Sequence, residues 1–231
     1  MRITWLGHSG FRIEIENATL LVDPWLDGNP MFPPDRRAEA IAGATHILLT
    51  HGHGDHAMST LSIARDGAIP IACIHELSEW WNATETVETI GFGKGGTIDL
   101  GGAKVTMVNA VHSSSTDYQD ARPLYAGSAA GFMIAGEGHT IYVSGDTDIM
   151  ADMGWMGEYH QPDIGILSCG GHYTMDMKGA AWAARKYFNF RVVIPCHYRT
   201  FPVLEQSAEA LADGLPGVRV VEPEVLVPVQ F

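Results

Sequence analysis

A short apolar run that leads into a group of potential metal ligands constrains this chain more than any other feature. Ile47-Leu48-Leu49 is typical of a buried strand, and Thr50-His51-Gly52-His53-Gly54-Asp55-His56 follows it directly. Imidazole and carboxylate ligands together suit Zn²⁺, Mn²⁺ or Fe. The sequence therefore predicts a strand whose C-terminal end carries a metal site.

The spacing of these ligands indicates how they divide. His51 and His53 are two residues apart, so on extended backbone both side chains point the same way and can bind one ion. Asp55 and His56 come where the chain turns into a helix, expected at about residues 57–65, which directs them toward a second ion. A single-metal site is the main alternative, and a polar loop that happens to be rich in histidine is a weaker one.

The composition is that of an ordinary globular chain of 231 residues, 46% hydrophobic and 18% charged. This length fits one domain, which we expect to span residues 1–231. The chain has 14 basic and 27 acidic residues, giving a net charge of −13. An acidic surface argues against nucleic acid or an anionic membrane as a partner. An anionic small-molecule substrate stays open, because bound dications would offset acidic charge locally.

The sequence has no recognisable targeting or disulfide pattern. Residues Met1-Arg2-Ile3-Thr4-Trp5 already have a strand pattern, and no run approaches the roughly 20 apolar residues of a membrane span. The cysteines, Cys73, Cys169 and Cys196, are widely spaced, so we expect buried free thiols. We therefore expect a cytoplasmic protein.

The pattern of apolar residues predicts a mixed α/β (α+β) chain. An antiparallel meander is expected over residues 2–6, 11–16 and 19–23, followed by a Pro-rich loop. The further strands are expected at 45–50, 69–74, 97–100, 104–108, 130–135, 140–144, 164–167, 192–195, 218–221 and 225–229. The helices are expected at about 57–65, 76–82, 177–188 and 203–215. Two mixed sheets packed face to face with helices outside fit this order.

Three further potential ligands stand at or just beyond the ends of apolar strands. His112 follows residues 105–111, Asp146 follows residues 141–145, and His197 follows residues 192–196. Each is weak alone, since a lone histidine after a strand is more often a loop residue. Together with the cluster at residues 51–56 they complete the ligand count of a two-metal site.

With these residues the sequence resembles the metallo-β-lactamase superfamily. The cluster from Thr50 to His56 is similar to its His-x-His-x-Asp-His motif, and the three later ligands occur in the same chain order. The resemblance is closer to a branch of metal-dependent hydrolases related to L-ascorbate-6-phosphate lactonase. The motifs of that branch stand at Trp5–Phe11, Leu21–Pro24, His112–Ser115, Gly171–Met175 and His197–Pro202, so the resemblance covers nearly the whole chain.

The resemblance implies a four-layer αββα sandwich with a binuclear metal site between the sheet edges. It assigns the first ion to His51, His53 and His112, and the second to Asp55, His56 and His197, with Asp146 as the bridging ligand. Zn²⁺ is the expected metal, with Mn²⁺, Fe and Ni²⁺ as alternatives, because these ligands serve all of them. It also implies assembly into a homo-oligomer.

The expected activity is hydrolysis of a small ester, lactone or amide. Two cations lower the pKa of a shared water from about 15.7 toward neutrality and polarise the substrate. Asp55 is expected to orient that water as well. The first alternative is a phosphodiesterase, and a weaker one is a protein that binds metal and ligand without turnover. A redox diiron role is disfavoured, because the diiron relatives have glutamate where this chain has His53.

The proton donor for the leaving group is not fixed by the motif. His8, His172 and Tyr198 are the candidates, and an ordinary loop role is equally open for each histidine. Asp23 is expected either to orient a ligand imidazole or to be a turn residue before proline. Arg199 could neutralise a phosphate or carboxylate of the substrate, but a solvated surface position is favoured for it. The loops at 25–34 and 113–125 are expected to wall the substrate pocket.

Overall fold

The first three strands form the antiparallel meander that the sequence predicts. The computed structural model describes residues 1–116 and 122–231, and the meander consists of β1 (Arg2–Trp5), β2 (Phe11–Ile15) and β3 (Ala18–Val22). Buried and half-buried residues alternate along β2, as expected where one face of a sheet covers the core.

The meander is one side of a seven-stranded mixed sheet in the order β16-β1-β2-β3-β4-β5-β6. The added strands are β4 (His46–Leu48), β5 (Ile71–Ile74), β6 (Thr89–Phe92) and β16 (Pro228–Gln230). The helices in this half are the 3-10 helix η1 (Pro34–Arg36), α1 (Arg37–Ile41), α2 (Gly54–Ala57), α3 (Thr60–Gly67) and α4 (His75–Thr84). Strands β3 to β6 are parallel, so their C-terminal ends lie along one edge.

The second seven-stranded sheet has the order β15-β14-β13-β12-β11-β8-β7. Its strands are β7 (Thr97–Leu100), β8 (Ala103–Asn109), β11 (Ala130–Gly136), β12 (His139–Val143), β13 (Ile164–Ser168), β14 (Val192–Cys196) and β15 (Arg219–Val220). Its helices are α5 (Met153–His160), α6 (Met177–Tyr187) and α7 (Glu209–Asp213). A separate pair, β9 (Ser115–Thr116) and β10 (Leu124–Tyr125), lies in the connection before β11.

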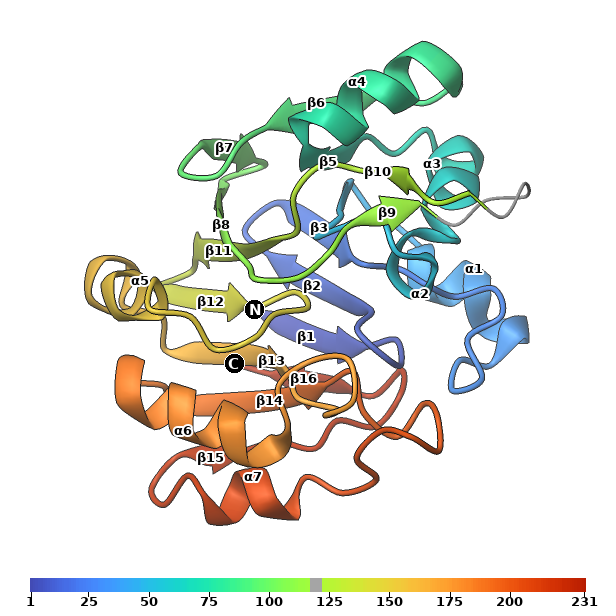
Figure 1. Ribbon diagram of the computed structural model, residues 1–231. Helices are drawn as coiled ribbons and strands as arrows, with labels where there is room; N and C mark the ends of the chain where they lie inside the picture. Colours follow the sequence, from blue (N-terminus) through green and yellow to red (C-terminus); the bar gives the residue numbers. More distant parts are fainter. Residues whose placement is uncertain (117–121) are drawn as a thin grey trace.

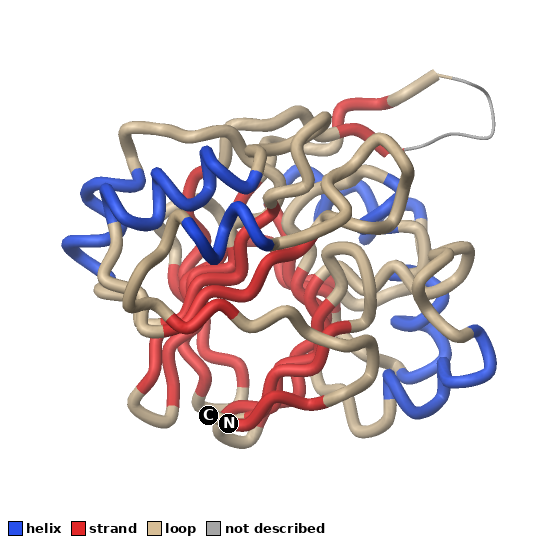
Figure 2. Tube along the Cα trace, turned by 90° about the horizontal axis from the view of Figure 1, so that it is seen from below, coloured by secondary structure: helices blue, strands red, loops and turns tan. Residues whose placement is uncertain are grey.

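The two sheets lie inside and the helices outside, as Figure 1 and Figure 2 show, and one connected cluster of buried apolar residues draws on both sheets. This is the layered sandwich that the sequence predicts. The chain ends lie side by side at one end of the molecule in Figure 2, where β16 pairs with β1. Within residues 1–116 and 122–231, no helix has the length and apolarity that crossing a membrane requires.

Two predicted helices differ from the structure. The helix expected at 57–65 is divided into α2 and α3, and it begins earlier, at Gly54, so that Asp55 and His56 lie inside α2. The helix expected at 203–215 is reduced to α7, Glu209–Asp213. Its first part is drawn into loop contacts instead, because the Glu205 N–H donates to the Gly170 carbonyl and the Glu205 carbonyl accepts from the Arg199 N–H.

Candidate metal centre

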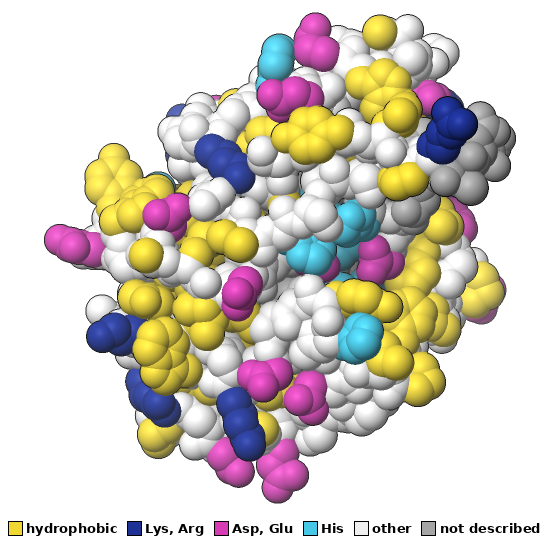
Figure 3. Space-filling model, in the orientation of Figure 1, with side chains coloured by type: hydrophobic (Ala, Val, Ile, Leu, Met, Phe, Trp, Pro, Cys, Tyr) yellow, Lys and Arg dark blue, Asp and Glu magenta, His cyan; other side chains and the backbone are white. Residues whose placement is uncertain are grey.

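Strand direction explains why the predicted ligands meet. Strands β8, β12 and β14 run the same way in the second sheet, and His112, Asp146 and His197 follow their C-terminal ends. In the first sheet His51 follows β4 in the same manner. Loops beyond the carboxyl ends of parallel strands are the usual place for a site in α/β proteins. Figure 3 shows histidine side chains gathered near the centre of one face, beside an acidic side chain.

Among the described residues, three sets of potential ligand atoms lie within 4.8 Å of one another, and one of them, Asp23, His51 and His56, connects the other two. The first ligand group contains His51, His53 and His112. The second ligand group contains His8, Asp55, His56 and His197. The sequence predicts His8 as a proton-donor candidate and not as a ligand, whereas the structure places its imidazole among the atoms of the second group.

Asp146 lies between the two groups. Its Oδ2 atom is 3.0 Å from His197 Nε2 and 3.3 Å from His56 Nε2, both of the second group. The same atom is 3.7 Å from His112 Nε2 and 4.0 Å from His51 Nε2, both of the first group. One carboxylate oxygen of Asp146 thus faces imidazole nitrogens of both groups.

Asp23 orients imidazoles of both groups from beneath the site. Its Oδ2 atom is 2.8 Å from His56 Nδ1 and accepts a 2.6 Å hydrogen bond from the Thr50 hydroxyl. The Thr50 Oγ1 atom is in turn 3.0 Å from His51 Nδ1. These contacts favour a proton on Nδ1 of each ring, so a cation that displaced any proton from Nε2 would find that nitrogen of both histidines able to bind it. The expectation that Asp23 is such an orienting residue fits this geometry better than a turn residue does.

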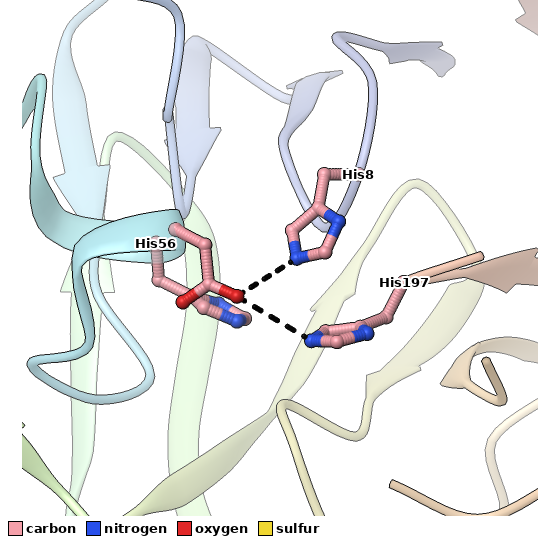
Figure 4. Close-up of side chains that lie close together, drawn as sticks. His8, His56 and His197 are labelled. Carbon is pink, nitrogen blue, oxygen red and sulfur yellow. Dashed lines mark hydrogen bonds and ion pairs between the residues drawn. The ribbon is translucent and has the colours of Figure 1, made fainter. Parts of the chain in front are cut away.

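His8 is held between Asp55 and the loop that follows β14. Its Nε2 atom is 3.1 Å from Asp55 Oδ2, and its Nδ1 atom is 2.8 Å from Thr200 Oγ1. His197 Nε2 lies 3.7 Å from the same oxygen of Asp55. Figure 4 shows the rings of His8 and His197 directed toward this one carboxylate oxygen.

Burial and mutual charge set the protonation of the cluster. Burial lowers the pKa of His8 to about 4 and lowers that of His51 well below its usual range. Burial opposes the charged form of Asp146 too, but His197 and His56 outweigh it and hold the pKa of Asp146 well below normal. For His56 the nearby Asp146 and Asp23 outweigh burial and raise the pKa. The carboxylates are therefore ionised, as metal ligands must be.

The residues present fit a bound cation. Within the described part of the chain, His56 Nε2 and Asp146 Oδ1 are buried and form no hydrogen bond. His51 Nε2 and His53 Nδ1 lie 3.0 Å apart, so one of these nitrogens donates a hydrogen bond to the other. Buried polar atoms normally find partners, so a cation beside Asp146 and His56 would supply the contacts that these two residues lack.

Other residues singled out in the sequence lie outside the two groups. His172 is exposed in the loop after β13, edge-on to Tyr173, and it lines surface hollows of about 390 and 550 Å³ on either side. Tyr198 is buried against Trp5, and its hydroxyl donates to Glu222. Arg199 lies over both of those rings. The three cysteines are free and buried, as predicted. Of the predicted loop 113–125, residues 117–121 lie outside the described part.

Comparison with known proteins gives the same family as the motifs. The family described as "Beta-lactamase superfamily domain" matches residues 18–198. A UPF0173 metal-dependent hydrolase of Cereibacter sphaeroides is 69% identical over 231 residues and covers all of both chains. One of Paracoccus denitrificans is 70% identical over 229 residues, 99% of each chain.

A solved structure extends the likeness to the fold. Igni18, described as a novel metallo hydrolase from the archaeon Ignicoccus hospitalis, is 31% identical and superimposes with a TM-score of 0.81 over 100% of this chain and 98% of its own. The chain therefore belongs to the metallo-β-lactamase superfamily, and within it to the UPF0173 family, whose members are named metal-dependent hydrolases.

Proposed function

We propose that this protein is a binuclear metal-dependent hydrolase that uses a metal-activated water on a small ester, lactone or amide. The observation that carries the proposal is the position of Asp146, whose one oxygen faces both ligand groups. A structural metal site is enclosed by a complete set of protein ligands, whereas a catalytic site keeps a position for water or substrate. Here His53, Asp55 and His112 are all partly exposed, so the site opens to solvent.

The ions divide along the two groups. His51, His53 and His112 hold the first ion, Asp55, His56 and His197 hold the second, and Asp146 lies between them. When bound, two divalent ions supply a water of lowered pKa and polarise the oxygen of the scissile group. Zn²⁺ suits this set of imidazoles and carboxylates best, and Mn²⁺, Fe and Ni²⁺ are the alternatives.

The protein's own groups position the reactants. The Asp55 side chain is 30% exposed, so its carboxylate can accept a hydrogen bond from a water at the mouth of the site and orient it. His8 and His172 were the two histidines proposed to donate a proton to the leaving group. His8 is fully buried, whereas His172 is exposed beside the hollows named above. We therefore favour His172 as the donor.

Replacing His172 tests that role. In His172→Ala we expect both ions to remain bound while turnover falls by about 10²-fold, the lower range for loss of a general acid. Metal content by elemental analysis and steady-state kinetics on the same sample provide the two readouts. His160→Gln, at the end of α5, is the matched control. Unchanged turnover in His172→Ala would remove His172 from the mechanism.

The substrate class is tested by loading the protein with Zn²⁺ or Mn²⁺, measuring metal content, and assaying a panel of lactones, esters, amides and phosphodiesters. We expect two ions per chain and activity on a carbonyl substrate. Fewer than two ions after reconstitution would contradict the binuclear site. Activity on phosphodiesters alone would replace our proposal with a phosphodiesterase. The homo-oligomeric state and cytoplasmic location stay predictions of the sequence.

A further inference from the structure

Two loops meet behind the second ligand group in an unusual backbone conformation. His8 and His197 both have left-handed backbone, with φ of 52° and 56°. The His197 N–H donates to the His8 carbonyl at 3.0 Å, and Trp5 Nε1 donates to the same carbonyl at 2.9 Å. Left-handed conformations cost non-glycine residues about 1–3 kcal/mol and persist mainly where a site requires them. The strain falls on the two residues whose imidazoles face Asp55.

The contacts of Thr200 indicate which nitrogen of His8 carries the proton. Thr200 Oγ1 lies 3.3 Å from the Tyr198 carbonyl and 3.2 Å from Met31 Sδ, and both of these atoms can only accept. If the hydroxyl proton goes to either of them, Thr200 must accept from His8 Nδ1 at 2.8 Å. A neutral imidazole has one N–H, so Nε2 of His8 then presents a lone pair.

That lone pair faces a carboxylate. His8 Nε2 and Asp55 Oδ2 are 3.1 Å apart, and two acceptors at this separation repel unless a cation lies between them. Ligand atoms that each bind Zn²⁺ at about 2.0–2.1 Å lie roughly 3–3.5 Å apart at the bond angles of four- or five-coordinate zinc. His8 Nε2 and Asp55 Oδ2, at 3.1 Å, fall within that range, and His197 Nε2 and Asp55 Oδ2, at 3.7 Å, are slightly farther apart. Asp146 Oδ2, between the groups, is 3.0 Å from His197 Nε2 and 3.3 Å from His56 Nε2.

We propose that His8 is a further ligand, through Nε2, of the ion held by Asp55, His56 and His197. This assignment rests on the proposed function, because it takes the second ion as given. It makes the two sites unequal. The second ion then has one more side-chain ligand than the first. The first ion is the one with room for water and substrate. It also gives His8 a role other than proton donation.

The ligand role can be read directly from the whole protein loaded with Zn²⁺. In long-range ¹H–¹⁵N spectra, we expect His8 Nδ1 to carry the proton and Nε2 to have the shift of a metal-bound nitrogen, the signals being assigned by their loss in His8→Gln. In parallel, Zn²⁺ titration of His8→Gln is expected to show one ion bound at least about 100-fold more weakly, beyond the 10–100-fold typical of an outer partner. The affinity for the other ion should change little.

His160→Gln is the control for loss of a histidine outside both groups, and the amide spectrum of each variant checks its fold. A proton on His8 Nε2 in the zinc-loaded protein would overturn the inference, since His8 would then be a donor to Asp55. Unchanged zinc affinity in His8→Gln would overturn it as well. If the wild-type protein itself bound only one ion, the proposed function would fail first, and that result is visible before any variant is made.

Discussion

The two ligand groups differ in how firmly the fold holds them. The three histidines of the second group, His8, His56 and His197, are all fully buried, and each is fixed by Thr200, by Asp23 or by a backbone hydrogen bond; only Asp55 of that group is partly exposed. In the first group only His51 is buried, whereas His53 and His112 are partly exposed. The difference indicates a preorganised site beside an open one. We infer that the second ion is the more tightly bound and that substrate enters over the first.

The largest effect is expected where the two groups join. In Asp146→Asn we expect both ions to bind more than about 100-fold more weakly, because this one oxygen faces both groups and outer partners alone cost 10–100-fold. Metal titration would measure it, with Asp163→Asn as control, since Asp163 is a half-buried aspartate that pairs with His139 outside both groups. Loss of only one ion would show that Asp146 serves a single group.

A smaller effect is expected on the stability of the metal-free protein, where replacing a histidine of the second group should cost more than replacing one of the first. His56 lies between Asp23 and Asp146, so His56→Ala removes the imidazole partner that these two buried carboxylates share and should lower the free energy of unfolding by about 3 kcal/mol. His112 has a side chain 16% exposed, and His112→Ala should cost less than about 1 kcal/mol. Urea unfolding of both apo variants compares them. Equal losses of unfolding free energy in the two variants would refute the distinction between a preorganised and an open ligand group.

The smallest expected difference is in metal affinity, between variants of Asp23 and of Thr50, which lie beneath the site. Asp23→Asn should weaken the binding of both ions by about 10–100-fold, because Asp23 contacts His56 directly and His51 through Thr50. Thr50→Val keeps the side-chain shape and should weaken the binding of the first ion only, by about 10-fold or less. Competition titration with a chelator resolves the two affinities. An effect of Thr50→Val on the second ion would contradict this division.

Much of the site followed from local sequence. The spacing of His51 and His53, and the strand ends before His112, Asp146 and His197, are local patterns, and the structure brings all of these residues together. These features are predictable because a ligand after a strand end depends only on the strand and its direction.

Other features depend on contacts between distant segments and could not be read from the sequence. The loop at 203–208 is not helical because Glu205 pairs with Gly170 and Arg199. The place of His8 depends on a backbone hydrogen bond from His197, and no spacing encodes it. The one available signal was a histidine between glycines, in Gly7-His8-Ser9-Gly10, directly after a strand.

Anomalous diffraction at the zinc absorption edge, from crystals of the zinc-loaded protein, would locate the two metal ions that we propose share Asp146. We predict two peaks about 3.5–4 Å apart, one among His51, His53 and His112 and the other among Asp55, His56 and His197, with Asp146 between them. A single peak under saturating zinc, or a second peak away from Asp146, would contradict the account.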